Sequence, residues 1–263
     1  MLRSFIIAFS TYSKVPMPKV TWDEKGMRYS MCFFPFVGVV IGACQYGILY
    51  LSAYVCTLGH VLGGAILTVI PILITGGIHM DGFLDTVDAK SSYKTKEEKL
   101  IILKDPHTGA FAIIYGIVYM ILYYAMMQTV AASNEKSPFS LSFVLTFALS
   151  YVWIRVLSGI SVLTFKKAKT EGMLAETAKA SDRSVLFYIS VIGVLCAGLM
   201  IALNPIPAFA ILGSTLLVFL YYRLMSYRVF GGITGDLAGY FLQLAELASL
   251  GAMNVVILTG GTI

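Results

Sequence analysis

Long apolar stretches separated by short polar segments dominate the chain. No Asp, Glu, Lys or Arg lies between Arg28 and Asp81. A helix that crosses a bilayer needs about 20 apolar residues, so this stretch predicts two such helices. A turn near residues 57–60 separates them, and Pro71 is expected to kink the second. With five later stretches, the pattern predicts an all-α polytopic membrane protein of about seven transmembrane helices. The expected spans are 31–55, 61–78, 109–130, 139–165, 184–203, 206–225 and 237–258.

Composition supports the membrane assignment. Apolar residues make up 58% of the 263 positions and charged residues only 13%, whereas soluble domains carry about 25% charged residues. The mean hydropathy is +0.82. We therefore expect a single transmembrane domain over residues 1–263 that contacts membrane lipid and binds no nucleic acid. The four cysteines lie in apolar stretches without a close-spaced ligand pair, so they predict neither a disulfide framework nor a zinc site.

The basic residues predict the orientation of these helices. Lys and Arg gather in residues 3–28, 90–104, 166–183 and 223–228, which seven spans place on one side of the membrane. The other side receives only Lys136, and Arg155 lies inside a span. Basic segments of membrane proteins stay cytoplasmic. We therefore expect a multi-pass protein of the cytoplasmic (inner) membrane, with its N-terminus in the cytoplasm and its C-terminus outside.

Acidic residues gather on this same side and point to chemistry there. Offsets of four and seven residues place Asp81, Asp85 and Asp88 on one narrow stripe of a helix. Their carboxylates repel one another, and a divalent cation would convert this repulsion into binding. Oxygen ligands select Mg²⁺, Mn²⁺ or Ca²⁺ over softer metals, and Mg²⁺ usually accompanies phosphate. A solvated acidic helix face is the alternative interpretation. His79 beside the three aspartates makes a weak zinc site by comparison.

Two further segments are typical of anion binding. Lys104 and Asp105 precede a span, where a helix N-terminus with a nearby lysine can hold an anion and the aspartate can add a metal ligand. The glycine-rich run 231–236 enters the last span, where backbone amides can cradle phosphate and Asp236 can join a metal. Ordinary helix capping explains both segments equally well. Glycines near the aspartate stripe either allow a ligand to approach the backbone or serve packing; they are Gly76, Gly77 and Gly82.

Two charges lie inside predicted spans. Arg155 is ten residues before Phe165, and Glu246 is ten residues after Asp236. At 1.5 Å per residue, both lie about 15 Å from the same end of their helices. Their matching depth predicts an ion pair. An ionisable residue inside a membrane suggests a function, and a purely structural pair is the alternative.

These motifs together resemble those of the cobalamin synthase family, the membrane-bound adenosylcobinamide-GDP ribazoletransferases. The run 75–88, TGGIHMDGFLDTVD, is similar to the family's G-G-x-H-x-D-G-x-x-D-x-x-D signature. Later segments resemble its K-D-x-x-x-G (residues 104–109) and its G-G-x-T-G-D with the following helix (residues 231–246). Residues 14–18 and 34–38 are similar to its R-L-P-x-P and F-P-L-V-G. Arg155 and the downstream Glu171-Gly172 also match.

The chain departs from the family pattern at a few positions. Ala89 replaces a usual glycine, Pro106 and His107 replace a usual Ser-Arg, and Lys14 replaces an arginine. The missing arginine at position 107 removes one phosphate contact, which Lys104 or His107 would have to supply. All the acidic residues of the pattern are present.

The resemblance implies a reaction and a set of site residues. Adenosylcobinamide-GDP and α-ribazole, or its 5′-phosphate, would be joined with release of GMP, and Mg²⁺ would be the cofactor. A homo-oligomer, or association with other enzymes of the corrinoid pathway, is left open. The expected catalytic residues are His79, Lys104 and Arg155, with His79 as either a proton acceptor or a hydrogen-bond partner of a metal-binding aspartate. The expected metal ligands are Asp81, Asp85, Asp88, Asp105 and Asp236. The expected substrate-binding residues are Lys14, Gly76, Gly77, Gly82, Thr234, Gly235 and Glu246.

Three other functions compete with this interpretation. Asp81-x-x-x-Asp85 also fits an intramembrane prenyltransferase, but such enzymes carry two aspartate motifs and the second region here has only Asp236. A CDP-alcohol phosphotransferase would need Ala-Arg after Asp81-Gly82. A transporter using Arg155 and Glu246 would place its site near the midplane of the membrane, whereas the acids of this chain cluster on one face.

Overall fold

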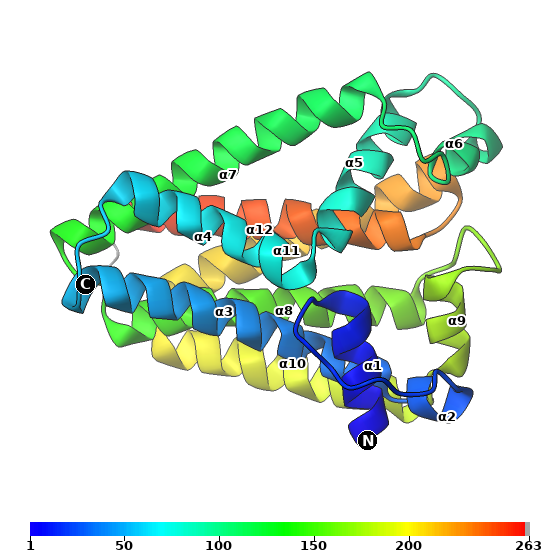
Figure 1. The fold of residues 1–263 in the computed structure, drawn as a ribbon, viewed down its shortest axis with the longest axis horizontal. Helices are drawn as coiled ribbons and strands as arrows, with labels where there is room; N and C mark the ends of the chain where they lie inside the picture. The colour runs from blue at the N-terminus through cyan, green and yellow to red at the C-terminus, as the bar shows by residue number, and fades with distance from the viewer. Residues whose placement is uncertain (261–263) are drawn as a thin grey trace.

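The protein is a bundle of α-helices whose long members run side by side (Figure 1). The computed structural model describes residues 1–260, and within this part of the chain there is no β-strand apart from one isolated bridge between Lys167 and Ile233. The long helices are α3 (Ser30–Tyr54), α4 (His60–Thr75), α7 (Ala110–Lys136), α8 (Leu141–Thr164), α10 (Ser184–Leu203), α11 (Pro205–Met225) and α12 (Gly235–Leu258). The all-α class predicted from the sequence is confirmed.

Six helices are long and apolar enough to cross a membrane: α3, α7, α8, α10, α11 with the π-turn that extends it, and α12. The bent pair α4 and α5 (Ile78–Ser91) brings the number to seven if it is counted as one span. We take α4 as the crossing part of this pair, because α5 carries three aspartates and a lysine within 14 residues. The predicted number of spans is therefore confirmed within the range of six to seven.

Burial distinguishes a central helix from peripheral ones. In α8 most of the apolar segment is buried, whereas less than a third of it is buried in α7, α10 and α11. The outward faces of these peripheral helices carry large apolar side chains such as Ile117 on α7 and Leu195 on α10. Lipid tails solvate such side chains as well as the core does. The apolar outer surface is therefore the surface expected of a membrane-embedded bundle.

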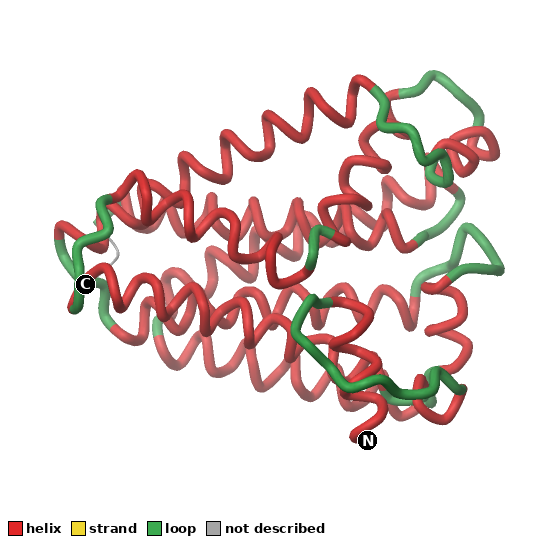
Figure 2. The backbone as a smooth tube through the Cα atoms, viewed as in Figure 1, coloured by secondary structure: helices red, strands yellow, loops and turns green. Residues whose placement is uncertain are grey.

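Short helices gather at one end of the bundle. They are α2 (Glu24–Met27), α5, α6 (Lys96–Ile102) and α9 (Met173–Ala180), with α1 (Leu2–Tyr12) packed nearby against α3 (Figure 1). Connections at the opposite end are short loops, which Figure 2 shows in green. The four basic segments of the sequence all lie at the end with the short helices, so the charge asymmetry inferred from the sequence is present in the fold. We call this end the charged end.

The sharpest turn in the fold lies between α4 and α5. Gly76 and Gly77 both adopt positive φ angles, 63° and 79°, which glycine tolerates without strain. The two helices meet there at 92°. Pro71 lies inside α4, which runs on through it to Thr75. The expected second span thus ends at the glycines, and the main change of direction occurs there, five residues beyond Pro71.

Candidate active site

The aspartate helix α5 is held against the start of α12 by glycines. A Cβ built on Gly82 would lie 2.8 Å from the carbonyl oxygen of Asp236, and one on Gly239 would lie 2.9 Å from the carbonyl oxygen of His79. Both distances are too short for any side chain, so the two backbones touch at this crossing. The close approach brings Asp236 beside the aspartates of α5. Gly82 therefore serves helix packing, the alternative that the sequence left open.

The glycine turn before α12 is tied to the loop after α8. The amide of Ile233 donates to the carbonyl of Lys166 (2.8 Å), and the amide of Ala168 donates to the carbonyl of Ile233 (2.9 Å). Thr234 caps α12 by accepting a hydrogen bond from the Leu237 amide, and its hydroxyl donates to Oδ2 of Asp236 (3.3 Å). These contacts fix the position of the Asp236 carboxylate at the helix start.

The N-terminal segment closes over the turn between α4 and α5. The Lys14 amide donates to the carbonyl of Ile74 (2.7 Å), and the aliphatic part of the Lys14 side chain lies directly on Gly76. Gly77 has open space around it. The structure thus brings together Lys14, Gly76 and Gly77, which the sequence predicted as substrate-binding residues from segments about sixty positions apart.

The carboxylates of α5 influence one another. Burial is the main cause that raises the pKa of the half-buried Asp85 carboxyl to about 6. The negative charges of Asp81, Asp236 and Asp88 raise the same pKa further. The four carboxylates are therefore near enough for the charge of the other three to affect Asp85.

Asp88 and Asp105 lie at the edge of this group. The Asp88 carboxylate lies against Gly109, at the start of α7. Asp105 is exposed and turned toward its own loop, where its Oδ1 accepts hydrogen bonds from the amide (2.9 Å) and ring Nδ1 (2.7 Å) of His107. These contacts lower the pKa of the Asp105 carboxyl. Asp105 is therefore the predicted metal ligand whose position fits that role least, because its carboxylate is turned to its own loop.

The donor set suits Mg²⁺, although the ligands do not converge as they stand. Within residues 1–260, no three His, Cys, Asp or Glu side chains are close enough together to hold an ion. The chemistry nevertheless fits, because carboxylate oxygen ligands favour a hard divalent cation. Asp81, Asp85 and Asp236 are the residues that would hold it.

A cavity of about 540 Å³ opens at this crossing, at the charged end of the bundle. Six of the residues predicted for the site line it: His79, Asp81, Lys104, Thr234, Gly235 and Asp236. The other predicted residues lie outside its wall. They are Lys14, Gly76, Gly77, Gly82, Asp85, Asp88, Asp105, Arg155 and Glu246.

Lys169 and Glu171 line the cavity but were not among the predicted site residues. The Lys169 ammonium donates to the carbonyl of Leu100 (2.9 Å). Burial, with the charge of Lys104, lowers the pKa of Lys169, and the Asp236 carboxylate opposes this shift. The sequence offered no signal for Lys169, which is one of several lysines in its loop. The Glu171-Gly172 match was the only signal for this segment.

His79 is buried between the cavity and the core. Its ring lies 5.9 Å from Phe34 and 6.5 Å from Tyr12, measured between centroids, and its Nε2 has no hydrogen-bond partner. Burial, followed by the charge of Arg155, lowers the pKa of the imidazole to about 3. The imidazole is therefore neutral at physiological pH but a weak proton acceptor. It makes no hydrogen bond to an aspartate of the site.

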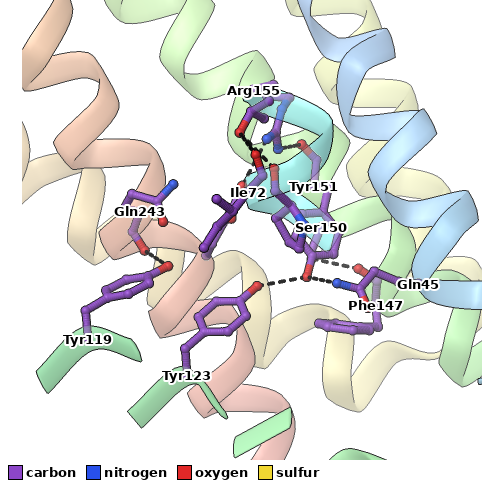
Figure 3. Close-up of polar contacts among 12 residues, drawn as sticks. Gln45, Ile72, Tyr119, Tyr123, Phe147, Ser150, Tyr151, Arg155 and Gln243 are labelled. Carbon is purple, nitrogen blue, oxygen red and sulfur yellow. Dashed lines mark hydrogen bonds and ion pairs between the residues drawn. The ribbon is translucent and has the colours of Figure 1, made fainter. Parts of the chain in front are cut away.

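Arg155 and Glu246 form the predicted ion pair. Arg155 Nη2 donates to Glu246 Oε1 at 3.0 Å, and the two side chains are 0% and 2% exposed. Arg155 Nη1 also donates to the carbonyl of Tyr151 (3.0 Å), and the Tyr151 hydroxyl meets that of Tyr123 at 3.1 Å (Figure 3). Gln45 Nε2 donates to the same Tyr151 hydroxyl. The pair is thus part of a polar network sealed inside the bundle.

Comparison with known proteins identifies the family of the chain. The cobalamin-5-phosphate synthase family matches residues 4–254. An adenosylcobinamide-GDP ribazoletransferase of Lachnoclostridium phytofermentans is 44% identical, over 98% of this chain and 95% of its own length. Proteins of the same name from Clostridium botulinum (strain Alaska E43) and Desulfitobacterium hafniense are 30% and 31% identical, each over 95% of this chain and 96% and 95% of their own lengths. No solved structure matches the chain. The chain therefore belongs to the cobalamin-5-phosphate synthase family.

Proposed function

We propose that this membrane transferase acts as an adenosylcobinamide-GDP ribazoletransferase. A ribose hydroxyl of α-ribazole, or of its 5′-phosphate, attacks the phosphorus that carries the cobinamide. The new oxygen–phosphorus bond replaces the bond to GMP, which leaves, and the hydroxyl proton passes to a base of the site. The products are GMP and adenosylcobalamin, or its 5′-phosphate. The names of the relatives support this activity, and the family assignment removes the prenyltransferase, phosphotransferase and transporter alternatives.

The observation that carries the proposal is the arrangement of charge around the cavity. Asp81 and Asp236 line it together with Lys104 and Lys169. Ammonium groups bind the negative oxygens of a diphosphate and stabilise the charge that develops on departing GMP. Mg²⁺ held by the carboxylates would neutralise the diphosphate and polarise the phosphorus that is attacked. Positioning and electrostatics supply most of the rate enhancement in phosphoryl transfer.

The remaining predicted residues have supporting roles in this proposal. Asp85 and Asp88 complete the acidic group, and Lys14 with the glycine turn flanks the phosphates. The buried pair of Arg155 and Glu246 holds α8 against α12. The proton acceptor is a carboxylate of the site or His79.

The proposal includes the placement of the site on the cytoplasmic side of the cytoplasmic membrane. The basic segments and the residues that line the cavity share one end of the bundle, and basic segments of membrane proteins face the cytoplasm. Nucleotide-linked substrates are also found in the cytoplasm. The test introduces a cysteine at exposed Tyr93 or at exposed Tyr54, which lies near the other end. Labelling of each cysteine by a membrane-impermeant reagent then shows which side of the membrane it faces.

Conversion of the substrates tests the activity. The purified protein in detergent receives adenosylcobinamide-GDP, α-ribazole and Mg²⁺, and the products are separated by chromatography. The expected result is equal amounts of GMP and adenosylcobalamin, with neither formed when α-ribazole is left out. Release of GMP without a corrinoid product, or no reaction at all, would contradict the proposal.

A further inference from the structure

The cavity has two ends of different chemistry. The exposed end carries the charges of Asp81, Lys104 and Glu171. The inner end is lined by side chains that are almost fully buried. They include Met31, Phe34, His79, Val162 and Leu242, each 5% exposed or less. The exposed end therefore suits a polar or charged group, and the inner end suits an apolar one.

Aromatic rings from three separate elements line the inner end. Tyr12 of α1 and Phe34 of α3 lie 4.5 Å apart between ring centroids, and the His79 ring of α5 completes the group. Aromatic groups recognise flat rings by stacking and edge contacts, in addition to the burial of apolar area. The inner end is thus shaped by contacts that favour an aromatic ligand.

This end offers few free hydrogen-bond partners. The Tyr12 hydroxyl donates to the Sδ of Met31 (3.7 Å), and His79 Nε2 is enclosed away from solvent. Of the other polar side chains that line the cavity, Ser158 is the one no more than 5% exposed. A buried polar group without a partner costs free energy. The inner end therefore suits a base with a small number of polar atoms better than one with several.

The size of the cavity selects between the two substrates. Pockets that enclose drug-sized ligands measure roughly 300–1,000 Å³, and this one, at about 540 Å³, is large enough for a nucleoside. A complete corrinoid is larger than any ligand of that class. Benzimidazole, the type of base that α-ribazole carries, has one free ring nitrogen, whereas guanine presents several donors and acceptors along its edge.

We infer that the inner end of this cavity binds the aromatic base of the nucleoside acceptor, a benzimidazole riboside. The sugar then points toward Asp81 and Asp236, where its hydroxyl meets the diphosphate, and the corrinoid stays outside the cavity. Phe34 and Tyr12 determine specificity by contact with the base. This inference rests on the proposed function and names the place of one substrate within that site.

A pair of matched substitutions on one helix tests the inference. Phe34→Leu removes a ring that lines the cavity, and Phe33→Leu makes the same change at the neighbouring position, whose ring packs against Phe5 and Phe36 instead. Binding is measured by equilibrium dialysis of the full chain in detergent, with α-ribazole in one arm and GMP with Mg²⁺ in the other. Thermal midpoints of both variants confirm that they fold.

The expected result is a loss of α-ribazole affinity of about three- to tenfold in Phe34→Leu, with unchanged affinity in Phe33→Leu. GMP affinity stays the same in both variants. The wild-type protein also binds α-ribazole more tightly than the corresponding adenine riboside, because adenine brings additional polar atoms to the inner end.

Three results would overturn the inference. Loss of GMP affinity in Phe34→Leu, with α-ribazole unaffected, would assign the inner end to guanine. Equal effects of the two substitutions would assign the rings to core packing, and binding of the adenine riboside as tight as that of α-ribazole would remove the argument from polar atoms. If the wild-type protein turns over its substrates and any of these results is found, the proposed function stands and only the assignment of this subsite is wrong. A wild-type protein without transferase activity contradicts the proposed function itself.

Discussion

Breaking the buried ion pair gives a direct test of how the core is stabilised. Arg155→Met leaves the Glu246 carboxylate without its 3.0 Å partner in a site where the side chains are at most 2% exposed. Removal of one partner from such a pair costs about 3–5 kcal/mol, because the remaining charge stays desolvated. A protein of this size loses about 2–4 °C of melting temperature per kcal/mol. We therefore expect the melting temperature to fall by roughly 6–20 °C.

The double variant separates the pair from the individual side chains. Arg155→Met with Glu246→Met replaces both charges by apolar groups of similar length, so it should recover most of the loss caused by Arg155→Met alone. The exposed pair of Arg3 and Asp23, at 3.2 Å, is the control and should show a coupling near zero. Thermal unfolding in detergent, at one heating rate, measures all variants. Strictly additive losses at Arg155 and Glu246 would refute the reasoning.

Further predictions concern the contact between α5 and α12. Asp85→Asn should remove a pH dependence of stability in metal-free buffer. Because the pKa of Asp85 is raised to about 6, protonation of its carboxyl favours the folded state. This stabilisation is complete below pH 4 and is lost as the pH rises through 6. Melting curves from pH 4 to 7 check this, and an equal decline in the variant would contradict it. Gly82→Ala should cost roughly 1–3 kcal/mol, because the new Cβ would lie 2.8 Å from the Asp236 backbone. Gly47→Ala, with open space around Gly47, is the control and should be neutral or slightly stabilising; an equal loss in both variants would show that no close contact exists at Gly82.

The membrane architecture was predictable because it depends on local composition. The charge-free stretch between Arg28 and Asp81 contains α3 and α4, and the predicted span 184–203 coincides with α10. Helix α1 was not predicted, because an eleven-residue segment is too short for a span and gives no clear signal alone. Pro71 was expected to kink the second span, but α4 runs on through it to Thr75, since a membrane helix can absorb a proline. Two consecutive glycines with positive φ determine the change in direction.

The ion pair was predictable for a different reason. Helix geometry fixes depth along the axis, so equal distances from the same membrane face placed Arg155 and Glu246 at one level, and the observed pair confirms this. The hydrogen bond from Arg155 to the Tyr151 carbonyl, and the contact of Tyr151 with Tyr123, were not predictable. They depend on how each helix is rotated about its axis, which the packing of the whole bundle determines.

The cavity was only partly predictable from motifs. Motif residues such as Asp81 and Asp236 line it, but its inner rings come from Tyr12 and Phe34, in apolar segments that resemble ordinary core. Lys169 looked like a residue that only sets topology. Nothing local distinguishes such residues, because long-range contacts among α1, α3, α5 and the loop after α8 bring them together.

The dependence of GMP release on Asp81 tests the central claim most directly. The measurement is GMP formed from adenosylcobinamide-GDP and α-ribazole by the wild-type protein and by Asp81→Asn, each in Mg²⁺ and in EDTA. Glu97→Gln, an exposed acid on α6 outside the cavity, is the matched control. We predict that the wild-type protein and Glu97→Gln release GMP only with Mg²⁺, and that Asp81→Asn loses activity about a hundredfold or more while its melting temperature is retained. Wild-type rates in Asp81→Asn, or full activity in EDTA, would contradict the account.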